Sequence, residues 1–175
     1  MSRAKAALAR SPALRYGDAM ARTTPATLAL DRLGVPYELA VYDYDPSAPR
    51  VGLHAAESLG VEPARVLKTL MTEVDGRPVC AVLASDREVS MKRLAAAIGG
   101  KSAAMMAPSA AERITGYKVG GVSPFGQKRK APVVVDAGAL GHAQVFVNGG
   151  QRGLQARLAP QDLVEALGAA VADIG

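Results

Sequence analysis

The sequence predicts one α+β domain in which short helices flank a mixed and mostly antiparallel sheet. Its 175 residues fit a single ordinary domain, and a content of 49% hydrophobic and 21% charged residues is typical of a chain that forms a globular core. Short apolar runs with strand character alternate irregularly with short helical segments, and two of these runs flank a tight turn. No internal repeat or low-complexity linker divides the chain, which favours a single domain.

The composition rules out several kinds of site. Cys80 is the only cysteine, which excludes an internal disulfide and a thiolate metal cluster. His54 and His142 are too few for a histidine-rich zinc site, so we expect neither a metal nor a cofactor. Only 4% of the residues are aromatic and tryptophan is absent, which leaves little for a platform that stacks single-stranded bases.

Most of the net positive charge lies at the N-terminus. Of the formal net charge of +5, residues 1–22 contribute five basic side chains against Asp18 alone, and residues 23–175 are almost neutral. We therefore predict a flexible basic extension over residues 1–22, a folded domain over residues 23–175 and no general affinity for DNA. The extension has no apolar run long enough for a signal-peptide core or a membrane helix, so we expect a cytoplasmic protein without a membrane partner.

Capping and turn residues mark the first elements of the domain. Thr24 and Pro25 are typical of a helix N-cap and first turn, and Gly34 ends the helix that they open. Next come a strand, a loop and a second short helix, predicted at residues 37–42, 43–52 and 54–59. Tyr42, Asp43 and Asp45 lie at the end of this strand, where they either line a pocket or simply end the strand.

A β-hairpin is the clearest strand signal. The apolar runs at residues 66–74 and 78–84 flank Asp75-Gly76, a dipeptide typical of a tight turn, and both strands are expected to be largely buried. Lys68 interrupts the first run with a charge. Its stem can lie on the core while the ammonium reaches the rim, or the cation can point at an anionic or carbonyl group of a ligand. The pattern leaves both readings open.

Helices and a long loop follow the hairpin. Ser90 is a candidate N-cap for a helix through Ile98, and Pro108 opens another helix through Ile114. Residues 116–128, the glycine loop, contain four glycines and a proline and cannot form regular structure throughout. The remaining elements are predicted as strands at residues 133–135, 144–147 and 154–158 and a final helix that begins at Pro160.

The glycine loop either presents backbone N–H groups to an oxyanion or phosphate, or serves as a tight connector. Its end, residues 121–128, nearly matches a phosphate-binding P-loop. The match fails because Gln127 displaces the lysine by one place, no Ser or Thr follows to bind magnesium, and Pro124 withholds an N–H. We therefore do not expect a nucleotide hydrolase.

The other reactive or charged residues have ordinary explanations. The run Lys128-Arg129-Lys130 is either solvated surface or a contact for the phosphates of a nucleic-acid end. His54 is expected on a helix surface, His142 in a turn and Cys80 in the core. No Ser or Cys has a spacing from either histidine that indicates a catalytic triad.

Several segments occur together in the order of a known family. They are Thr24-Pro25-Ala26, Tyr42-Asp43-Tyr44-Asp45-Pro46, Lys68-Thr69-Leu70, the glycine loop, Gly149-Gly150-Gln151-Arg152-Gly153-Leu154 and Ala159-Pro160-Gln161-Asp162-Leu163. In these segments the sequence resembles the YbaK/EbsC family, aminoacyl-tRNA deacylases related to the editing domain of prolyl-tRNA synthetase. The likeness covers residues 23–174, and the family's fold is a single α+β domain around a mixed, mostly antiparallel sheet.

The resemblance implies removal of a wrong amino acid from tRNA(Pro), with Cys-tRNA(Pro) as the substrate. The implied partners are the acceptor end of tRNA(Pro) and, as a second candidate, prolyl-tRNA synthetase. The implied catalytic residues are Lys68, Gly120 and Gly121. The expected substrate-binding residues are Tyr42, Asp43, Thr69, Ser123 and Asn148. From their position beside the glycine loop, and not from the resemblance, Lys128, Arg129 and Lys130 are the candidate nucleic-acid contacts.

Two residues depart from the family pattern. Tyr44 stands where relatives often carry His, and Asn148 stands where a relative has Ser before the double glycine. Both substitutions alter the polarity of the expected pocket, which leaves the amino-acid preference open between cysteine and another small residue such as alanine.

The absence of a credible Ser, Cys or His nucleophile leads to a hypothesis for the mechanism. An aminoacyl ester is already activated, so the site needs only to hold it and to stabilise the developing oxyanion. The thiol of a cysteinyl substrate can then attack its own ester carbonyl and give a thiolactone. Two other functions remain open: a module that binds aminoacyl-tRNA or its synthetase without chemistry, and a hydrolase of free aminoacyl esters or amides.

Overall fold

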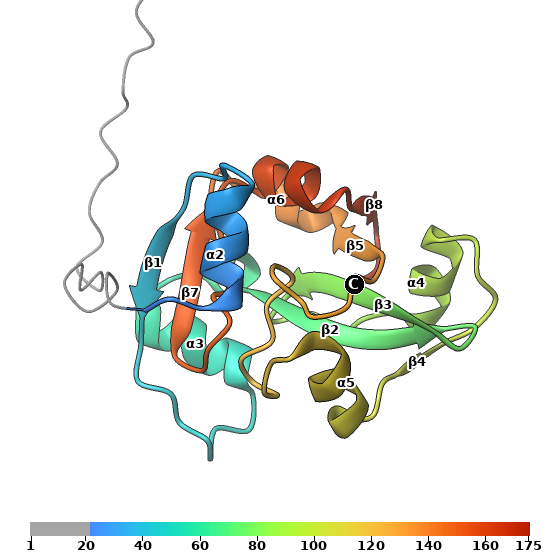
Figure 1. Ribbon diagram of the computed structural model, residues 1–175, viewed down its shortest axis with the longest axis horizontal. Helices are drawn as coiled ribbons and strands as arrows, with labels where there is room; N and C mark the ends of the chain where they lie inside the picture. Colours follow the sequence, from blue (N-terminus) through green and yellow to red (C-terminus); the bar gives the residue numbers. More distant parts are fainter. Residues whose placement is uncertain (1–21) are drawn as a thin grey trace, which may run out of the picture.

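Two sheets form the framework of the computed structural model, which describes residues 22–175 (Figure 1). The smaller sheet is antiparallel, with the strand order β1 (Glu38–Val41), β7 (Leu154–Leu158), β6 (Val145–Asn148). The larger sheet has the order β4 (Ala103–Met105), β2 (Leu67–Val74), β3 (Arg77–Ala84), β5 (Val133–Asp136), β8 (Ala170–Ala172). Strands β4, β2 and β3 are antiparallel, whereas β3, β5 and β8 are parallel. The predicted α+β fold with a mixed, mostly antiparallel sheet is confirmed.

The helices of the described residues flank the sheets. They are α2 (Pro25–Arg32), α3 (Val51–Leu59), α4 (Met91–Ala97), α5 (Pro108–Thr115) and α6 (Pro160–Leu167). Figure 1 shows α6 on one side of the sheets and α3 and α5 on the other. None of the helices within residues 22–175 is long and apolar enough to cross a membrane. The extension predicted over residues 1–22 lies outside the described residues, apart from Arg22.

Capping side chains and first-turn prolines explain most of the helix starts. Thr24 and Thr27 cap α2 reciprocally, because each side-chain oxygen accepts a hydrogen bond from the other residue's N–H, at 2.9 and 3.1 Å. The predicted helix starts are also found at Met91, Pro108 and Pro160. The helix expected at residues 54–59 begins earlier, at Val51, because its N-cap Arg50 makes no side-chain capping bond that would mark the start.

The β2–β3 hairpin has the predicted turn. Val74 pairs with Arg77 across Asp75 and Gly76, whose φ angles of 49° and 78° suit a tight two-residue turn. Strand β3 is buried along nearly its whole length, but residues 68–70 of β2 are only half-buried. The expectation of two largely buried strands is therefore wrong for β2, because this stretch forms the wall of a cavity.

The two sheets share one apolar core. Val66 precedes β2 and forms an isolated parallel bridge with Phe146 of β6, which joins the sheets. One cluster of buried side chains draws on both sheets and on helices α2, α5 and α6, and it includes Leu30, Met71, Val147, Leu158 and Leu163. Cys80 belongs to this core, as expected, and burial raises the pKa of its thiol to about 12.

The short edge strands β4 and β8 have no counterpart among the predicted elements. Each has three residues and consists mostly of alanine, so neither carries an alternating pattern. Strand β4 pairs with the end of β2, and β8 pairs with β5. Their strand conformation therefore depends on neighbours that are distant in the sequence.

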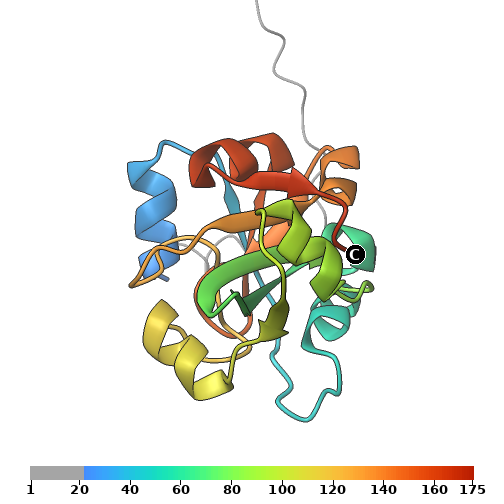
Figure 2. The same ribbon diagram turned by 90° about the vertical axis from the view of Figure 1, so that its right-hand side faces the viewer.

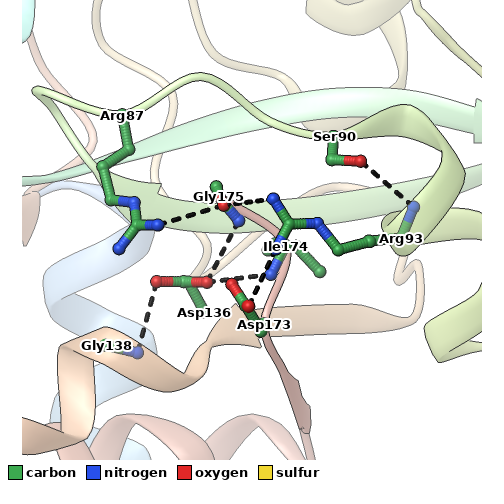
Figure 3. Close-up of polar contacts among 8 residues, drawn as sticks. All are labelled: Arg87, Ser90, Arg93, Asp136, Gly138, Asp173, Ile174 and Gly175. Atoms are coloured by element: carbon green, nitrogen blue, oxygen red, sulfur yellow. Dashed lines mark hydrogen bonds and ion pairs between the residues drawn. The ribbon is translucent and has the colours of Figure 1, made fainter.

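A buried carboxylate anchors the C-terminal residues (Figure 3). Asp136, the last residue of β5, is 2% exposed. Its Oδ1 accepts hydrogen bonds from the N–H groups of Ile174 at 2.9 Å and Gly175 at 3.2 Å, and its Oδ2 accepts one from Gly138 at 3.2 Å. The buried Asp136 carboxylate thereby has its hydrogen-bond donors, at the point where the pairing between β5 and β8 ends.

Two arginines complete this anchor. Arg87 and Arg93 both donate to the Gly175 carbonyl oxygen, at 3.1 and 2.6 Å, and Arg93 also pairs with Asp173 at 2.8 Å. Figure 2 shows β8 along β5 near α6, with α4 in front. The anchor thus connects the end of the chain to the β3–α4 loop, which contains Arg87.

Replacing Asp136 by alanine leaves three backbone N–H groups without their acceptor. An unpaired buried donor costs about 1–3 kcal/mol, so we expect Asp136→Ala to lower the free energy of unfolding by about 3 kcal/mol, measured by urea denaturation. Arg93→Ala breaks an exposed ion pair and should lower it by less than about 1 kcal/mol. Equal losses for the two variants would contradict the role given to Asp136.

Candidate functional site

A cavity of about 540 Å³ opens beside the first half of β2. Its volume lies within the range typical of small-molecule sites. The walls come from the end of β1, the start of α3, the β3–α4 loop, the start of α5, the glycine loop and the β6–β7 turn. The sequence-predicted residues that line it are Tyr42, Lys68, Thr69, Gly120 and Asn148.

Lys68 places a half-buried ammonium in this wall. Among residues 22–175 it forms no ion pair and no side-chain hydrogen bond, so its charge is free to meet a ligand. Burial lowers the pKa of Lys68 below that of an ordinary lysine; the nearby Glu88 carboxylate opposes this shift, and the Arg50 guanidinium adds to it. The geometry favours the reading of Lys68 as a cation aimed at a ligand group.

Three buried polar atoms around the same cavity have no hydrogen-bond partner within the described part of the chain. They are Tyr42 Oη, Thr69 Oγ1 and Gln155 Oε1, and all three residues line the cavity. Burial raises the pKa of Tyr42, and the nearby Gln155 side chain partly opposes that shift. An unpaired buried polar group costs about 1–3 kcal/mol, so three of them at one cavity indicate that a polar ligand supplies the partners.

Asn148 joins two loops that form one side of the cavity. Its Oδ1 accepts hydrogen bonds from the N–H groups of Gly150 at 2.7 Å and Gln151 at 3.2 Å, in the β6–β7 turn. Its Nδ2 donates to the Gly120 carbonyl oxygen at 3.2 Å, in the glycine loop. Asn148 therefore holds the glycine loop against the turn, and its side-chain amide is largely occupied in doing so.

The two predicted backbone donors of the glycine loop differ in their surroundings. The Gly121 N–H donates to the Lys118 carbonyl oxygen at 2.8 Å, and Gly121 does not line the cavity. Gly120 lines it with a φ of 89°, and its N–H has no partner among residues 22–175. A Cβ at Gly120 would lie 2.9 Å from the Tyr44 hydroxyl oxygen, so glycine is required for this close approach.

The sequence analysis assigned no role to Arg152, which lines the cavity opposite Tyr44. Its Nε and Nη2 atoms donate to the Val119 carbonyl oxygen at 3.0 and 2.8 Å, and its guanidinium carbon lies 5.4 Å from the centre of the Tyr44 ring. Arg152 thus fixes both the glycine loop and Tyr44. The one feature of the sequence that could have indicated Arg152 is its position in the Gly149–Leu154 segment, which carries part of the family resemblance.

Positive charge predominates around the cavity. Arg50, Lys68, Arg87 and Arg152 line it, against the carboxylates of Asp86 and Glu88. The excess of cations suits a ligand that carries negative charge or exposes carbonyl and phosphate oxygens. The sequence did not single out Arg50, Asp86, Arg87 and Glu88, because they lie in loops without a recognisable spacing.

Several predicted site residues lie outside the cavity. Asp43 is exposed, and its carbonyl oxygen lies 3.0 Å from His54 Nε2. Ser123 is fully buried, and its Oγ accepts a hydrogen bond from Phe125 N at 3.2 Å. Lys128, Arg129 and Lys130 are exposed and do not line this cavity.

The second half of the glycine loop is a packed structural segment. The Tyr117 hydroxyl donates to the Phe125 carbonyl oxygen at 2.6 Å, and Gln127 Nε2 donates to the Ser123 carbonyl oxygen at 3.0 Å. Gly126, with a φ of 66°, lies so close to α2 that a Cβ would overlap the backbone of Pro25. Because this half is buried against α2, it cannot surround a phosphate as a P-loop does.

No activated nucleophile lines the cavity within residues 22–175. The Ser85 hydroxyl donates to the Val66 carbonyl oxygen at 2.5 Å, and neither histidine lines the cavity. The Cys80 thiol is fully buried and is not part of the wall. The same residues contain no group of three or more His, Cys, Asp or Glu side chains that could hold a metal ion. The arrangement can bind and polarise an ester, but it supplies no attacking group of its own.

Comparisons with known proteins point to tRNA editing. The family model described as aminoacyl-tRNA editing domain matches residues 48–166. EbsC of Enterococcus faecalis, assigned as a Cys-tRNA(Pro)/Cys-tRNA(Cys) deacylase, is 34% identical over 153 residues, which cover 86% of this chain and 92% of EbsC. A proline–tRNA ligase of Maridesulfovibrio salexigens is 39% identical over 72 residues, which cover 41% of this chain and 12% of the ligase.

A solved structure supports the fold. It is described as a trans-editing enzyme for prolyl-tRNA synthetase, and it superposes with a TM-score of 0.74 at 23% identity. The match covers 88% of this chain and 98% of the solved one. At this level of identity the likeness shows a shared fold.

Gly126→Ala should destabilise the protein more than Gly116→Ala. Both glycines have a positive φ, at 66° and 79°, so both substitutions strain the backbone by about 1–2 kcal/mol. Only the Gly126 variant also forces the loop away from Pro25, since a Cβ at Gly116 meets nothing closer than Lys128 Cβ at 3.5 Å. We expect at least about 2 kcal/mol of additional loss in the free energy of unfolding, measured by urea denaturation; losses within error of each other would show that the loop does not need this contact.

Proposed function

The chain belongs to the aminoacyl-tRNA editing domain family, and we propose that it removes cysteine from mischarged Cys-tRNA(Pro). The observation that carries the proposal is that, in one cavity, the Lys68 ammonium and three buried polar atoms beside it have no partner in the described part of the chain. The assignment of EbsC, which matches most of this chain, supports cysteine as the amino acid and tRNA(Pro) as one carrier. The match to part of a proline–tRNA ligase supports a link to proline charging.

Each wall of the cavity has a role in this proposal. Lys68 binds the ester carbonyl or the phosphate of the terminal nucleotide, and the free Gly120 N–H donates to the oxyanion that develops during cleavage. Tyr42, Thr69 and Gln155 orient the amino acid, since their unpaired atoms include both a hydroxyl donor and an amide acceptor. Asn148 acts through Gly120 and is a positioning residue rather than a substrate contact.

The thiol of the substrate replaces a protein nucleophile. The thiol loses its proton to solvent, and its sulfur attacks the ester carbonyl carbon of the same aminoacyl group. The carbon–sulfur bond forms, and the bond between that carbon and the ribose oxygen breaks. The ribose oxygen takes a proton from solvent, and the cysteine leaves as a thiolactone. The site accelerates this step by holding the ester and by stabilising the oxyanion at Gly120 and Lys68.

Three residues have no direct contact role in this proposal. Gly121 closes the turn that exposes the neighbouring Gly120 N–H, because its own N–H is bonded to Lys118. Ser123 supports the buried half of the glycine loop. Asp43 holds the α3 side of the cavity through its contact with His54.

We expect Lys68→Ala to lower the rate of deacylation of Cys-tRNA(Pro) by at least about 100-fold, because one preorganised donor of this kind contributes about that factor to catalysis. The measurement follows the loss of labelled amino acid from matched Cys-, Ser-, Ala- and Pro-tRNA(Pro). The thiol mechanism predicts rapid loss of cysteine and far slower loss of serine, which presents a hydroxyl in place of the thiol.

Lys92→Ala is the matched control, because Lys92 is an exposed lysine that lines neither of the cavities. It should leave the rate unchanged. Equal rates on the cysteinyl and seryl substrates would contradict the thiol mechanism and indicate an activated water as the nucleophile. Preferential loss of alanine would keep the reaction and change the substrate, and no turnover on any of the four would favour a module that only binds aminoacyl-tRNA.

A further inference from the structure

A second cavity, of about 780 Å³, lies at the turn end of the β2–β3 hairpin. Arg77, the first residue of β3, lines one part of it, and Arg129 and Lys130 line another. The apolar part of the wall is formed by Val74, Pro78, Val79, Ile98, Ile114, Ala131 and Pro132. The cavity therefore combines basic side chains from two separate segments with an apolar surface.

The basic side chains of this second cavity are available to a ligand. Arg77, Arg129 and Lys130 are exposed, and they form no ion pair with any described residue. Asp75 is the only carboxylate among the lining residues. Its two oxygens accept hydrogen bonds from the N–H groups of Lys101 and Ser102, both at 3.0 Å. The lining keeps an excess of positive charge, and its one carboxylate is already engaged.

Backbone hydrogen bonds hold the basic residues in place. The Arg129 N–H donates to the Ile114 carbonyl oxygen at 3.0 Å, which attaches the basic run to the end of α5. Cys80 N donates to the Pro132 carbonyl oxygen at 2.8 Å, which attaches the other end of this segment to β3. The cations are thus carried by structured backbone on both sides, which limits the entropy lost when they bind.

The two cavities lie at opposite ends of the same strand. Lys68 is near the start of β2, and Val74, its last residue, lines the second cavity. The six residue-to-residue steps from Lys68 to Val74 span about 20 Å of extended strand. A stacked nucleic-acid strand advances about 3.4 Å per nucleotide, so this distance corresponds to about six nucleotides.

From this juxtaposition we propose that the second cavity binds backbone phosphates of the RNA strand whose aminoacylated end occupies the first cavity. The inference rests on the proposed function, because that function places the ester at Lys68. Phosphates about six nucleotides from the aminoacylated end meet Arg77, Arg129 and Lys130. The contact is made to the backbone and is independent of base sequence, so it supplies affinity for an RNA body without reading its identity.

The test compares a long and a short substrate in the double variant Arg77→Ala/Arg129→Ala. The KM for full-length Cys-tRNA(Pro) should rise about tenfold with kcat unchanged. The slope of log KM against log salt concentration should become smaller by about 1.5. Cleavage of a cysteinyl ester on a trinucleotide should stay within about twofold of the wild-type rate, because this substrate cannot reach the second cavity.

Arg32→Ala/Lys92→Ala is the matched control, since it removes two exposed cations that line neither cavity. Equal effects of the two double variants on full-length tRNA would overturn the proposal, as would an equal loss on the trinucleotide ester. A binding arm with uncharged tRNA(Pro) separates this test from the proposed function. If the wild type cleaves neither substrate, the deacylase proposal fails, whereas the phosphate site stands or falls on whether Arg77→Ala/Arg129→Ala weakens tRNA binding about tenfold.

Discussion

The side-chain amide of Asn148 is the contact on which the geometry of the first cavity depends. It connects the β6–β7 turn to the glycine loop. The two residues that this connection joins, Asn148 and Gly120, are 28 positions apart in the sequence. That bond holds the carbonyl of Gly120 on the side of the turn, and the Gly120 N–H has no partner within residues 22–175. Arg152 reinforces the same loop through Val119. In the proposed function, the donor for the oxyanion is therefore preorganised by two polar side chains that need not touch the substrate.

This preorganisation has a free-energy cost that the rest of the fold must offset. The half-buried Lys68 and three buried polar atoms, none of them paired with any other residue of 22–175, all destabilise the cavity. The packing that offsets them lies in the second half of β2 and along β3, which is almost entirely buried. Strand β2 thus has two functions, because its second half is mostly buried in the core whereas residues 68–70 form the cavity wall.

Local signals account for what could be predicted from the sequence. Thr24, the Asp75-Gly76 turn and the prolines at helix starts act through neighbours in the chain, so their elements were found. Strands β4 and β8 form only because β2 and β5 offer free edges, which no local pattern records. Lys68 was identifiable because a charge interrupts an apolar run. Gln155 was not, since it sits in the buried strand β7, where its unpaired oxygen is visible only in three dimensions. For the same reason the sequence could not distinguish Gly120, with its free N–H, from Gly121, whose N–H closes a turn.

The two ends of β2 separate recognition from chemistry. In the proposed function, contacts made at the second cavity are the same in the bound substrate and in the transition state, so they contribute uniform binding, whereas the Gly120 N–H acts on charge that develops only during cleavage. Because the β2–β3 register is continuous from Leu67 to Val74, the separation between the two regions is rigid. A rigid separation allows affinity for the RNA body to change at Arg77 and Arg129 without altering the geometry around the ester. Selectivity for the amino acid then depends on the first cavity alone, where a substrate that carries its own nucleophile needs none from the protein.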